Sequence, residues 1–195
     1  SVNWARVLAQ IVYYGYASLR FSGDVRFCVP TGNFGNVFAG YLARRMGFPI
    51  EKLIVATNEN DILAQFFKTG IYQRGEVHFT STPAMDIQVA SNFERYLYYY
   101  LGEDAERLSA FMGQFASTGS AQLDGPPQDE AILATSGATQ DVMGAIGEVY
   151  RNGDYVADPH TAVGLVSAAR FASLKTPVVC VATAHPAKFP ESVCE

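Results

Sequence analysis

One stretch of the chain decides its fold: Val25-Arg26-Phe27-Cys28-Val29-Pro30-Thr31-Gly32-Asn33-Phe34-Gly35-Asn36. Its first five residues are mostly apolar and β-branched, which predicts a buried strand. Apolar side chains then recur at positions 38, 41, 42 and 46, the spacing of one helix face. The order is therefore strand, glycine loop, helix, and the loop lies where the strand ends.

The glycine loop has the composition of an anion-binding site. Gly32 and Gly35 are expected to take positive φ and to let a ligand approach the backbone closely. The N–H groups of the loop and of the first helical turn then point outward together, which suits a phosphate dianion. Asn33 and Asn36 add amide donors, and Asn36 is also a candidate helix cap.

Spacing alone does not separate a phosphate site from a plain glycine turn between strand and helix. The loop lacks the longer glycine fingerprint of dinucleotide-binding folds. No G-K-[ST] sequence follows it, so it is not a nucleotide P-loop. The residues by themselves therefore support a site for a phosphate-sized anion and nothing narrower.

Beyond the loop, strand and helix patterns alternate. Further strands are predicted at 52–57, 76–80 and 176–182, and helices at 61–67, 87–101, 103–116, 138–151 and 160–172. This alternation predicts an α/β fold, a three-layer and mainly parallel sheet with helices on both faces. Ligands of such sheets bind at the carboxyl ends of the strands, where residues 32–36 and Thr183 are both expected. We expect 1–118 and 130–195 to form one domain, joined by a surface connection at 119–129.

The first residues predict a helix with an apolar stripe. The stripe consists of Trp4, Val7, Leu8, Ile11 and Val12, and Ser1 or Asn3 is a natural cap. Arg6 lies on the first turns, either as a solvated arginine or as a guanidinium group for a second anion. Because no leader precedes this helix, we expect the chain to begin inside a larger protein.

Composition narrows the function classes. A net charge of −5 argues against a nucleic-acid surface, and the apolar run at 7–19 is too short and interrupted to span a bilayer. Cys28, Cys180 and Cys194 show no metal-binding or redox spacing. Since Cys28 and Cys180 fall in predicted strands, we interpret them as buried free thiols in a reducing compartment, the cytoplasm.

Three other features have ordinary structural interpretations. Residues 134–139 resemble a second anion loop, but no convincing strand leads into them, so a plain helix cap is favoured. His78, His160 and His185 are scattered without metal-ligand spacing, so no metal site is expected. Residues 158–161 read first as a capped helix start, with a place at the edge of a ligand cleft as the alternative.

Taken together, several segments resemble threonine synthase, a pyridoxal-phosphate enzyme of the tryptophan-synthase-β fold type. The segments are 1–6, 29–36, 54–61, 85–95, 158–164 and 182–189, spread in order over the whole chain. The resemblance implies the large cofactor-binding domain of a fold-type-II enzyme, without the N-terminal domain. It also implies a reaction: γ-elimination of phosphate from O-phospho-L-homoserine, then addition of water to give L-threonine.

The resemblance also implies roles for particular residues. The loop residues that would hold the phosphate of pyridoxal 5′-phosphate are Gly32, Asn33, Phe34, Gly35 and Asn36. Thr183 would hydrogen-bond the pyridine nitrogen, and its neutral hydroxyl would moderate the electron-sink strength of the ring. Ser1 and Arg6, and less directly Asn3, would grip the phosphate of the substrate, a small molecule.

One departure concerns catalysis. In the family, the Schiff-base lysine lies in a Phe-Lys-Asp-type segment of the N-terminal portion, and no such segment occurs here. We therefore expect this lysine upstream of Ser1 and expect the chain alone to be inactive. Two alternatives stay open: a non-catalytic homologue that binds a phosphorylated ligand, and a related phospho-lyase that acts on another phosphorylated amino acid.

Overall fold

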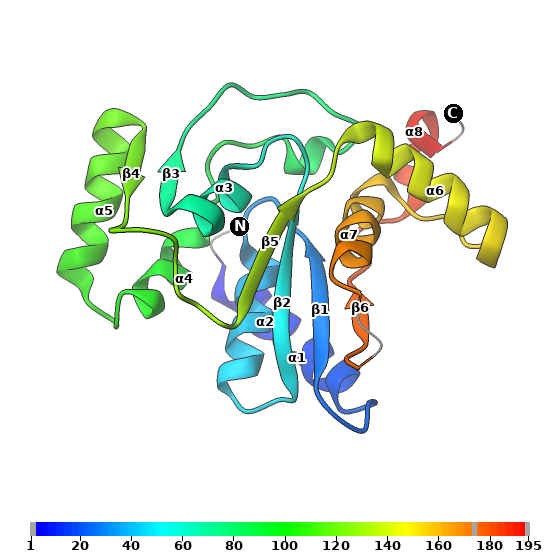
Figure 1. Ribbon diagram of the computed structural model, residues 1–195, viewed down its shortest axis with the longest axis horizontal. Helices are drawn as coiled ribbons and strands as arrows, with labels where there is room; N and C mark the ends of the chain where they lie inside the picture. Colours follow the sequence, from blue (N-terminus) through cyan, green and yellow to red (C-terminus); the bar gives the residue numbers. More distant parts are fainter. Residues whose placement is uncertain (1–2, 173–174, 194–195) are drawn as a thin grey trace.

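The computed structural model describes residues 3–172 and 175–193, and its centre is a four-stranded parallel sheet (Figure 1). The strands are β1 (Val25–Pro30), β2 (Ile50–Thr57), β5 (Ile132–Ser136) and β6 (Val178–Cys180), in the order β5-β2-β1-β6. The chain moves from β1 to β2 and β5 on one side, then returns to place β6 on the other side of β1. The crevice between the carboxyl ends of β1 and β6 is therefore the topological switch point, where such sheets bind ligands.

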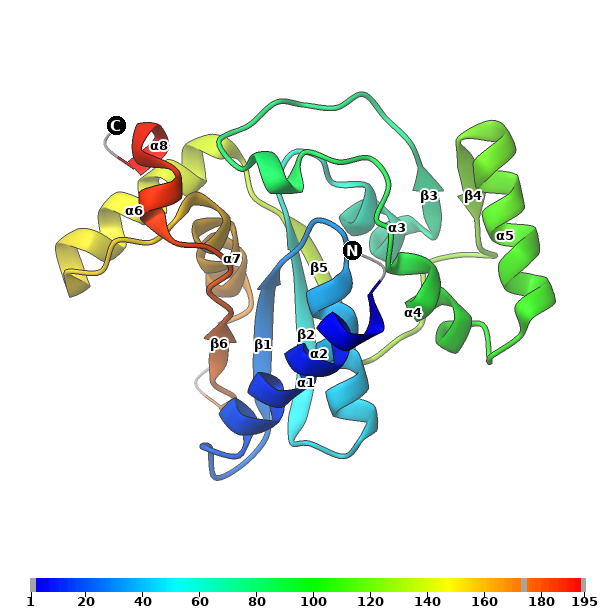
Figure 2. The ribbon, with the colours of Figure 1, turned by 180° about the vertical axis from the view of Figure 1, so that it is seen from behind.

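Helices cover both faces of the sheet. On one face lie α1 (Trp4–Ser18) and α2 (Gly35–Arg45), and on the other lie α6 (Thr139–Gly153) and α7 (Pro159–Arg170) (Figure 2). The predicted three-layer α/β arrangement is therefore confirmed. The longer strands and helices also lie within a few residues of the ranges that the sequence predicts, apart from the cases described below.

The strand residues divide the core into two layers because successive side chains point to opposite faces. Residues 27, 29, 53 and 55 pack towards α1 and α2, whereas residues 28, 54 and 56 pack towards α6 and α7. Both sets are buried, as expected for a parallel sheet covered on both sides. Because both faces of β1 are buried, its register is fixed, and so is the position of the glycine loop that follows its carboxyl end.

The remaining elements lie outside the four-stranded sheet, and two of them form a separate antiparallel pair of strands. They are α3 (Ile62–Thr69), β3 (Ile71–Gln73), η1 (Pro83–Met85), α4 (Phe93–Tyr100), α5 (Ala105–Thr118), β4 (Ser120–Gln122), η2 (Pro186–Lys188) and α8 (Pro190–Val193). Between them lies a cluster of aromatic rings in which Phe93 contacts Phe34, Phe66 and Tyr72, with ring centroids 4.8–5.4 Å apart. Tyr96 of α4 is fully buried in the same cluster.

The strand predicted at 76–80 is wrong. Side chains, instead of a neighbouring strand, pair with the backbone of this segment: Asn60 bonds both N–H and C=O of His78, and Asp86 accepts from the N–H of Thr80. Asp86 also accepts from the Asn58 amide at 2.7 Å. The predicted helix at 87–101 begins only at Phe93, because 85–92 belong to this polar network and its turn.

Two further expectations need correction. A strand, β5, does lead into residues 134–139, contrary to the prediction. On α1, the buried face carries Val7 and Ile11, whereas the other three members of the predicted apolar stripe are exposed: Trp4, Leu8 and Val12.

Among the residues that the structure describes, no helix has the length and apolar character needed to cross a membrane. Cys28 is buried and Cys180 is half-buried, both as free thiols, so full burial is confirmed for Cys28 alone. Their α-carbons are register partners on β1 and β6. The pKa of the Cys28 thiol is raised by its hydrogen bond with Cys180 and by burial, so Cys28 is a packed thiol and not a reactive one.

We expect Gly164→Ala to destabilise the fold, because a Cβ at this position of α7 would lie 2.6 Å from Cys180 Sγ and 3.0 Å from Pro30 Cγ. Such overpacking should lower the free energy of unfolding by about 1–3 kcal/mol. The matched control is Gly144→Ala on α6, where no atom lies within 4 Å of the new Cβ. That substitution should stabilise the helix by up to about 1 kcal/mol in the same denaturant titration. Equal effects of the two substitutions would contradict the close packing at Gly164.

Candidate functional site

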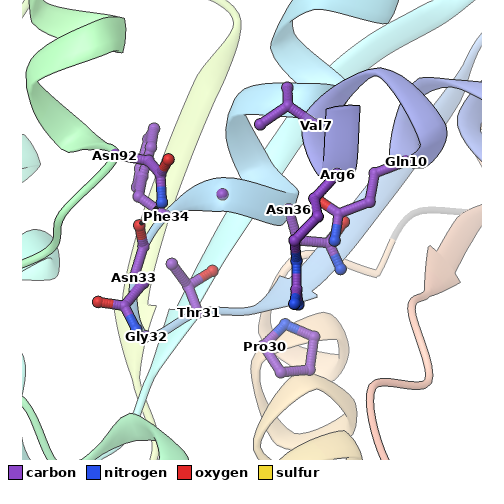
Figure 3. A pocket seen from close by; sticks show the side chains of 11 residues that line it. Arg6, Val7, Gln10, Pro30, Thr31, Gly32, Asn33, Phe34, Asn36 and Asn92 are labelled. Atoms are coloured by element: carbon purple, nitrogen blue, oxygen red, sulfur yellow. Dashed lines mark hydrogen bonds between the residues drawn. The ribbon is translucent and has the colours of Figure 1, made fainter. Parts of the chain in front are cut away.

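A cavity of about 200 Å³ opens at the carboxyl end of β1 (Figure 3). Its wall comes from the glycine loop, from α1 through Arg6, Val7 and Gln10, and from Asn92 before α4. The residues of the predicted anion site therefore meet in one cavity, together with the arginine proposed for a second anion. The cavity lies beside the switch point that the strand order defines.

Backbone N–H groups are the main polar feature of this wall. Thr31 makes the last ladder bond, donating its N–H to the carbonyl of Ala56 at 2.7 Å. The next regular bond runs from the N–H of Phe38 to the carbonyl of Phe34 at 2.9 Å. Among the described residues, nothing accepts from the six N–H groups between them, those of residues 32–37. Unpaired amides at a helix N-terminus are the donors that bind phosphate.

The glycines of the loop act differently from the prediction. Neither Gly32 nor Gly35 has positive φ; the left-handed residue is Phe34, with φ of 63°. Gly32 is needed for close approach, because a Cβ there would lie 2.7 Å from the carbonyl oxygen of Ala84. At Gly35 a Cβ would lie 3.3 Å from the side-chain nitrogen of Asn92. The loop is thus pressed against residues 84 and 92, and the strain falls on a residue whose ring is buried in the aromatic cluster.

Asn36 is fixed by α1 and does not cap α2. Its side-chain oxygen accepts from the hydroxyl groups of Tyr13 at 2.5 Å and Tyr14 at 2.7 Å. The N-cap position belongs to Phe34, which makes no side-chain cap bond. Burial raises the pKa of Tyr13 to about 12 although the bond to Asn36 lowers it, so Tyr13 stays a neutral donor. With the oxygen of Asn36 occupied, its amide nitrogen is the end left for a ligand.

The predicted substrate residues on α1 are only partly brought to the cavity. Arg6 lines it and has no ion-pair or hydrogen-bond partner for its side chain among the described residues. Asn3 does not line it, and its side chain caps α1 by accepting from the N–H of Ala5 at 2.9 Å. Ser1 lies outside the described residues. Among the described residues that line this cavity, Arg6 is therefore the only one with a cationic side chain.

Thr183 follows β6 and reaches the same edge of the sheet without lining the cavity. Its N–H donates to the hydroxyl oxygen of Thr161 at 3.2 Å, and that hydroxyl in turn donates to the buried Asp158 carboxylate. Burial would raise the pKa of Asp158, but hydrogen bonds from His160 and Thr161 outweigh it and hold the pKa at about 2. The predicted helix cap at 158–161 is confirmed, and it also fixes the backbone at Thr183.

The loop at 134–139 is filled from within. Gly137 donates its N–H to the carbonyl of Thr57, and Thr139 donates to the carboxylate of Glu59 at 2.6 Å. A protein carboxylate thus takes the place that an external anion would occupy. The structure therefore favours the plain-cap interpretation of this loop, as the sequence predicts.

Two other polar groups escaped the sequence analysis. Asn92 lines the cavity and contacts the loop, and Gln10 of α1 lines it one helical turn from Arg6. Asn92 lies in the segment 85–95 that carries the family resemblance, which was the only available signal for it. Within residues 3–172 and 175–193, no group of three or more metal-ligating side chains could hold a metal ion.

Comparison with known proteins agrees with this geometry. A family model described as the C-terminal part of threonine synthase matches residues 161–195. Threonine synthase from Pseudomonas aeruginosa is 46% identical over 201 residues, covering 99% of this chain and 43% of its own length. Threonine synthase from Schizosaccharomyces pombe is 40% identical over 227 residues, which cover 99% of this chain and 44% of the length of that protein.

The chain is similar to threonine synthases along its whole length. A solved structure titled as PLP-bound threonine synthase from Brucella melitensis superposes with a TM-score of 0.95 at 43% identity, covering 99% of this chain and 43% of that one. For yeast threonine synthase the TM-score is 0.93 at 37% identity, with the same coverage. The predicted resemblance and fold class are thus confirmed, and the chain spans less than half the length of these threonine synthases.

Arg6→Ala should weaken binding of inorganic phosphate to the chain roughly fivefold, since an exposed charge pair contributes about 1 kcal/mol. Isothermal titration at low and high salt measures this effect. The matched control is Arg20→Ala, which removes a charge just beyond α1, where Arg20 contacts Tyr16. Equal losses in both variants would contradict a specific role of Arg6 and indicate a general charge effect.

Proposed function

We propose that this chain forms the cofactor-phosphate side of a threonine synthase, which converts O-phospho-L-homoserine and water into L-threonine and phosphate. The observation that carries the proposal is the run of six N–H groups at residues 32–37 that find no acceptor in the described part of the chain, next to Arg6 in one cavity. The similarity to threonine synthases over 99% of the chain supports it. Because the chain spans 43% of that relative, the activity belongs to a longer protein.

We assign the loop to the phosphate of pyridoxal 5′-phosphate, the cofactor named for the Brucella melitensis relative. The backbone N–H groups of Gly32, Asn33, Phe34, Gly35 and Asn36 act as donors, and the side-chain amides of Asn33 and Asn36 line the same cavity. The donor set fits a dianion, because it presents N–H groups and no carboxylate. The ring of Phe34 packs in the core, so this residue contributes only its backbone.

Thr183 is assigned to the pyridine nitrogen of the cofactor. When bound, the cofactor supplies stabilisation of substrate carbanions. Thr183 would offer a neutral hydroxyl to the ring from the far side of the β1–β6 crevice, while its own N–H is held by Thr161. A threonine hydroxyl neither gains nor loses a proton at neutral pH, so it would orient the ring without fixing a charge on it.

Arg6 is assigned to the phosphate group of the substrate. Its guanidinium group can bind a phosphate through two parallel hydrogen bonds, and it lies on α1, across the cavity from the loop (Figure 3). Ser1 and Asn3 remain proposed contributors at the start of α1. A cation at this position would bind the phosphate group of the intact substrate. It would also stabilise the negative charge on that group as it leaves, which favours elimination.

The proton-transferring lysine of the reaction is assigned to the part of the protein outside this chain. In the described part of the chain, none of the four lysines lines the cavity: Lys52, Lys68, Lys175 and Lys188. A non-catalytic protein that binds a phosphorylated ligand would also lack a lysine in this cavity, so the assay must distinguish such a protein from the enzyme. The free thiols Cys28 and Cys180 suit a reducing compartment, and we place the enzyme in the cytoplasm.

The test uses a protein that contains this sequence together with the rest of the threonine synthase length. We expect it to release phosphate from O-phospho-L-homoserine in equal amount with L-threonine, and to leave homoserine unchanged. Phosphate released with an oxo acid in place of threonine would identify a phospho-lyase. Binding of the cofactor phosphate without turnover would identify the non-catalytic homologue.

In the same protein, Thr183→Val should lower kcat about five- to tenfold, because it removes one hydrogen bond worth roughly 1 kcal/mol while keeping the side-chain shape. Thr183→Ser retains the hydroxyl group and is the matched control, expected to keep most of the activity. The backbone bond to Thr161 is available to both variants. Equal kcat values for the Thr183→Val and Thr183→Ser variants would contradict a role of the Thr183 hydroxyl in the proposed site.

A further inference from the structure

We propose that Asn92 is a positioning residue for the phosphate loop, an inference that rests on the proposed function of that loop. Asn92 lies outside the loop, immediately before α4, and is 1% exposed. Its backbone N–H donates to the carbonyl oxygen of Asn33 at 3.1 Å, and its side-chain nitrogen donates to the same oxygen at 3.0 Å. Two donors from one residue thus hold a single carbonyl group of the loop.

The direction of this carbonyl sets the direction of the next N–H group. In a trans peptide, the C=O of one residue and the N–H of the following residue point in opposite directions. None of the described peptide bonds is cis. The clamp from Asn92 therefore turns the N–H of Phe34 away from α4 and towards the cavity, which Phe34 lines. Rotation of this one peptide would remove a donor from the middle of the phosphate cradle.

The loop needs such a restraint because its backbone is strained at Phe34. This residue combines φ of 63° with a large side chain, a conformation that is costly for anything but glycine, asparagine or aspartate. The ring of Phe34 is held by Phe93, the neighbour of Asn92, with centroids 5.4 Å apart. Asn92 thus fixes the peptide that precedes Phe34, through the carbonyl of Asn33, and Phe93 packs against the ring of Phe34.

The side chain of Asn92 also shows that its orientation serves the loop. Its oxygen is buried and has no partner among the described residues, which carries a free-energy cost. Turning the amide over would set this oxygen against the carbonyl of Asn33 and leave that carbonyl with only the backbone N–H of Asn92 as a donor. Gly35 leaves room for the amide, since a Cβ there would lie 3.3 Å from its nitrogen. The side-chain nitrogen of Asn92 thus keeps its hydrogen bond to Asn33, while the side-chain oxygen stays without a partner among the described residues.

The experiment titrates inorganic phosphate into the ¹⁵N-labelled chain and follows the amide signals of residues 32–37. In the wild type, we expect downfield proton shifts at Phe34 and at the first turn of α2. In Asn92→Ala, the shift of Phe34 should be lost and phosphate should bind about five- to tenfold more weakly, while the shifts of Asn36 and Val37 persist. Asn92→Leu, which keeps the side-chain volume, should behave in the same way and guards against a folding defect of the alanine variant.

The matched control is Ser91→Ala, which removes the 3.3 Å bond to the side chain of Asn33 and the long 3.4 Å bond from the Asn92 amide, but leaves both donors to the carbonyl of Asn33. It should bind phosphate as the wild type does, with the Phe34 shift intact. A normal Phe34 shift and normal affinity in both Asn92 variants would overturn the positioning role and leave the phosphate site standing. Absence of any shift in the wild type would overturn the phosphate site itself, and the role of Asn92 with it.

Discussion

The structure depends on one interruption of backbone pairing. After the bond from Thr31 to Ala56, six successive N–H groups have no acceptor among the described residues, and helical bonding begins at Phe38. Folded proteins pair nearly all such donors, so an unpaired run must be held open by its surroundings and completed by solvent or a ligand. The parallel sheet supplies the place, since the carboxyl end of β1 lies at the switch point. The aligned peptides of α2 add positive potential at the same point.

Three parts of the chain hold this loop in shape. Residue 84 packs against Gly32, Asn92 bonds the carbonyl of Asn33, and the two tyrosines of α1 hold Asn36. A left-handed phenylalanine costs roughly 1–3 kcal/mol, and two hydrogen bonds of about 1 kcal/mol each are enough to offset most of it. The polar network of Asp86 matters for the same reason, because it fixes the segment 76–88 that carries residue 84. The family-like segments 54–61 and 85–95 are therefore supports for the loop.

The sequence predicts what local patterns determine. The apolar, β-branched run of β1, the apolar face of α2 and the alternation of strand and helix patterns were sufficient to predict the layered α/β fold, and residue types alone predicted the anion loop. The left-handed residue was wrongly expected at the glycines because the choice of Phe34 depends on a ring pocket built from Phe67, Phe93 and Tyr96. The irregular segment 76–80 looked like a strand because its bonding partners are the side chains of Asn60 and Asp86, which lie outside the segment. Contacts with side chains elsewhere in the chain leave no trace in local periodicity.

The two halves of the proposed site differ in how firmly this chain builds them. The phosphate loop is held at several points along its backbone, whereas Thr183 is exposed, and a single hydrogen bond, to Thr161, fixes its backbone among the described residues. That bond ends in Asp158, whose lowered pKa means that its stabilisation is present above about pH 4 and is lost as the pH falls towards 2. At neutral pH the carboxylate is therefore charged and the threonine pair is in place. In the proposed site, the loop is the anchor for the phosphate of the cofactor, and Thr183 is a second, separate anchor for its ring.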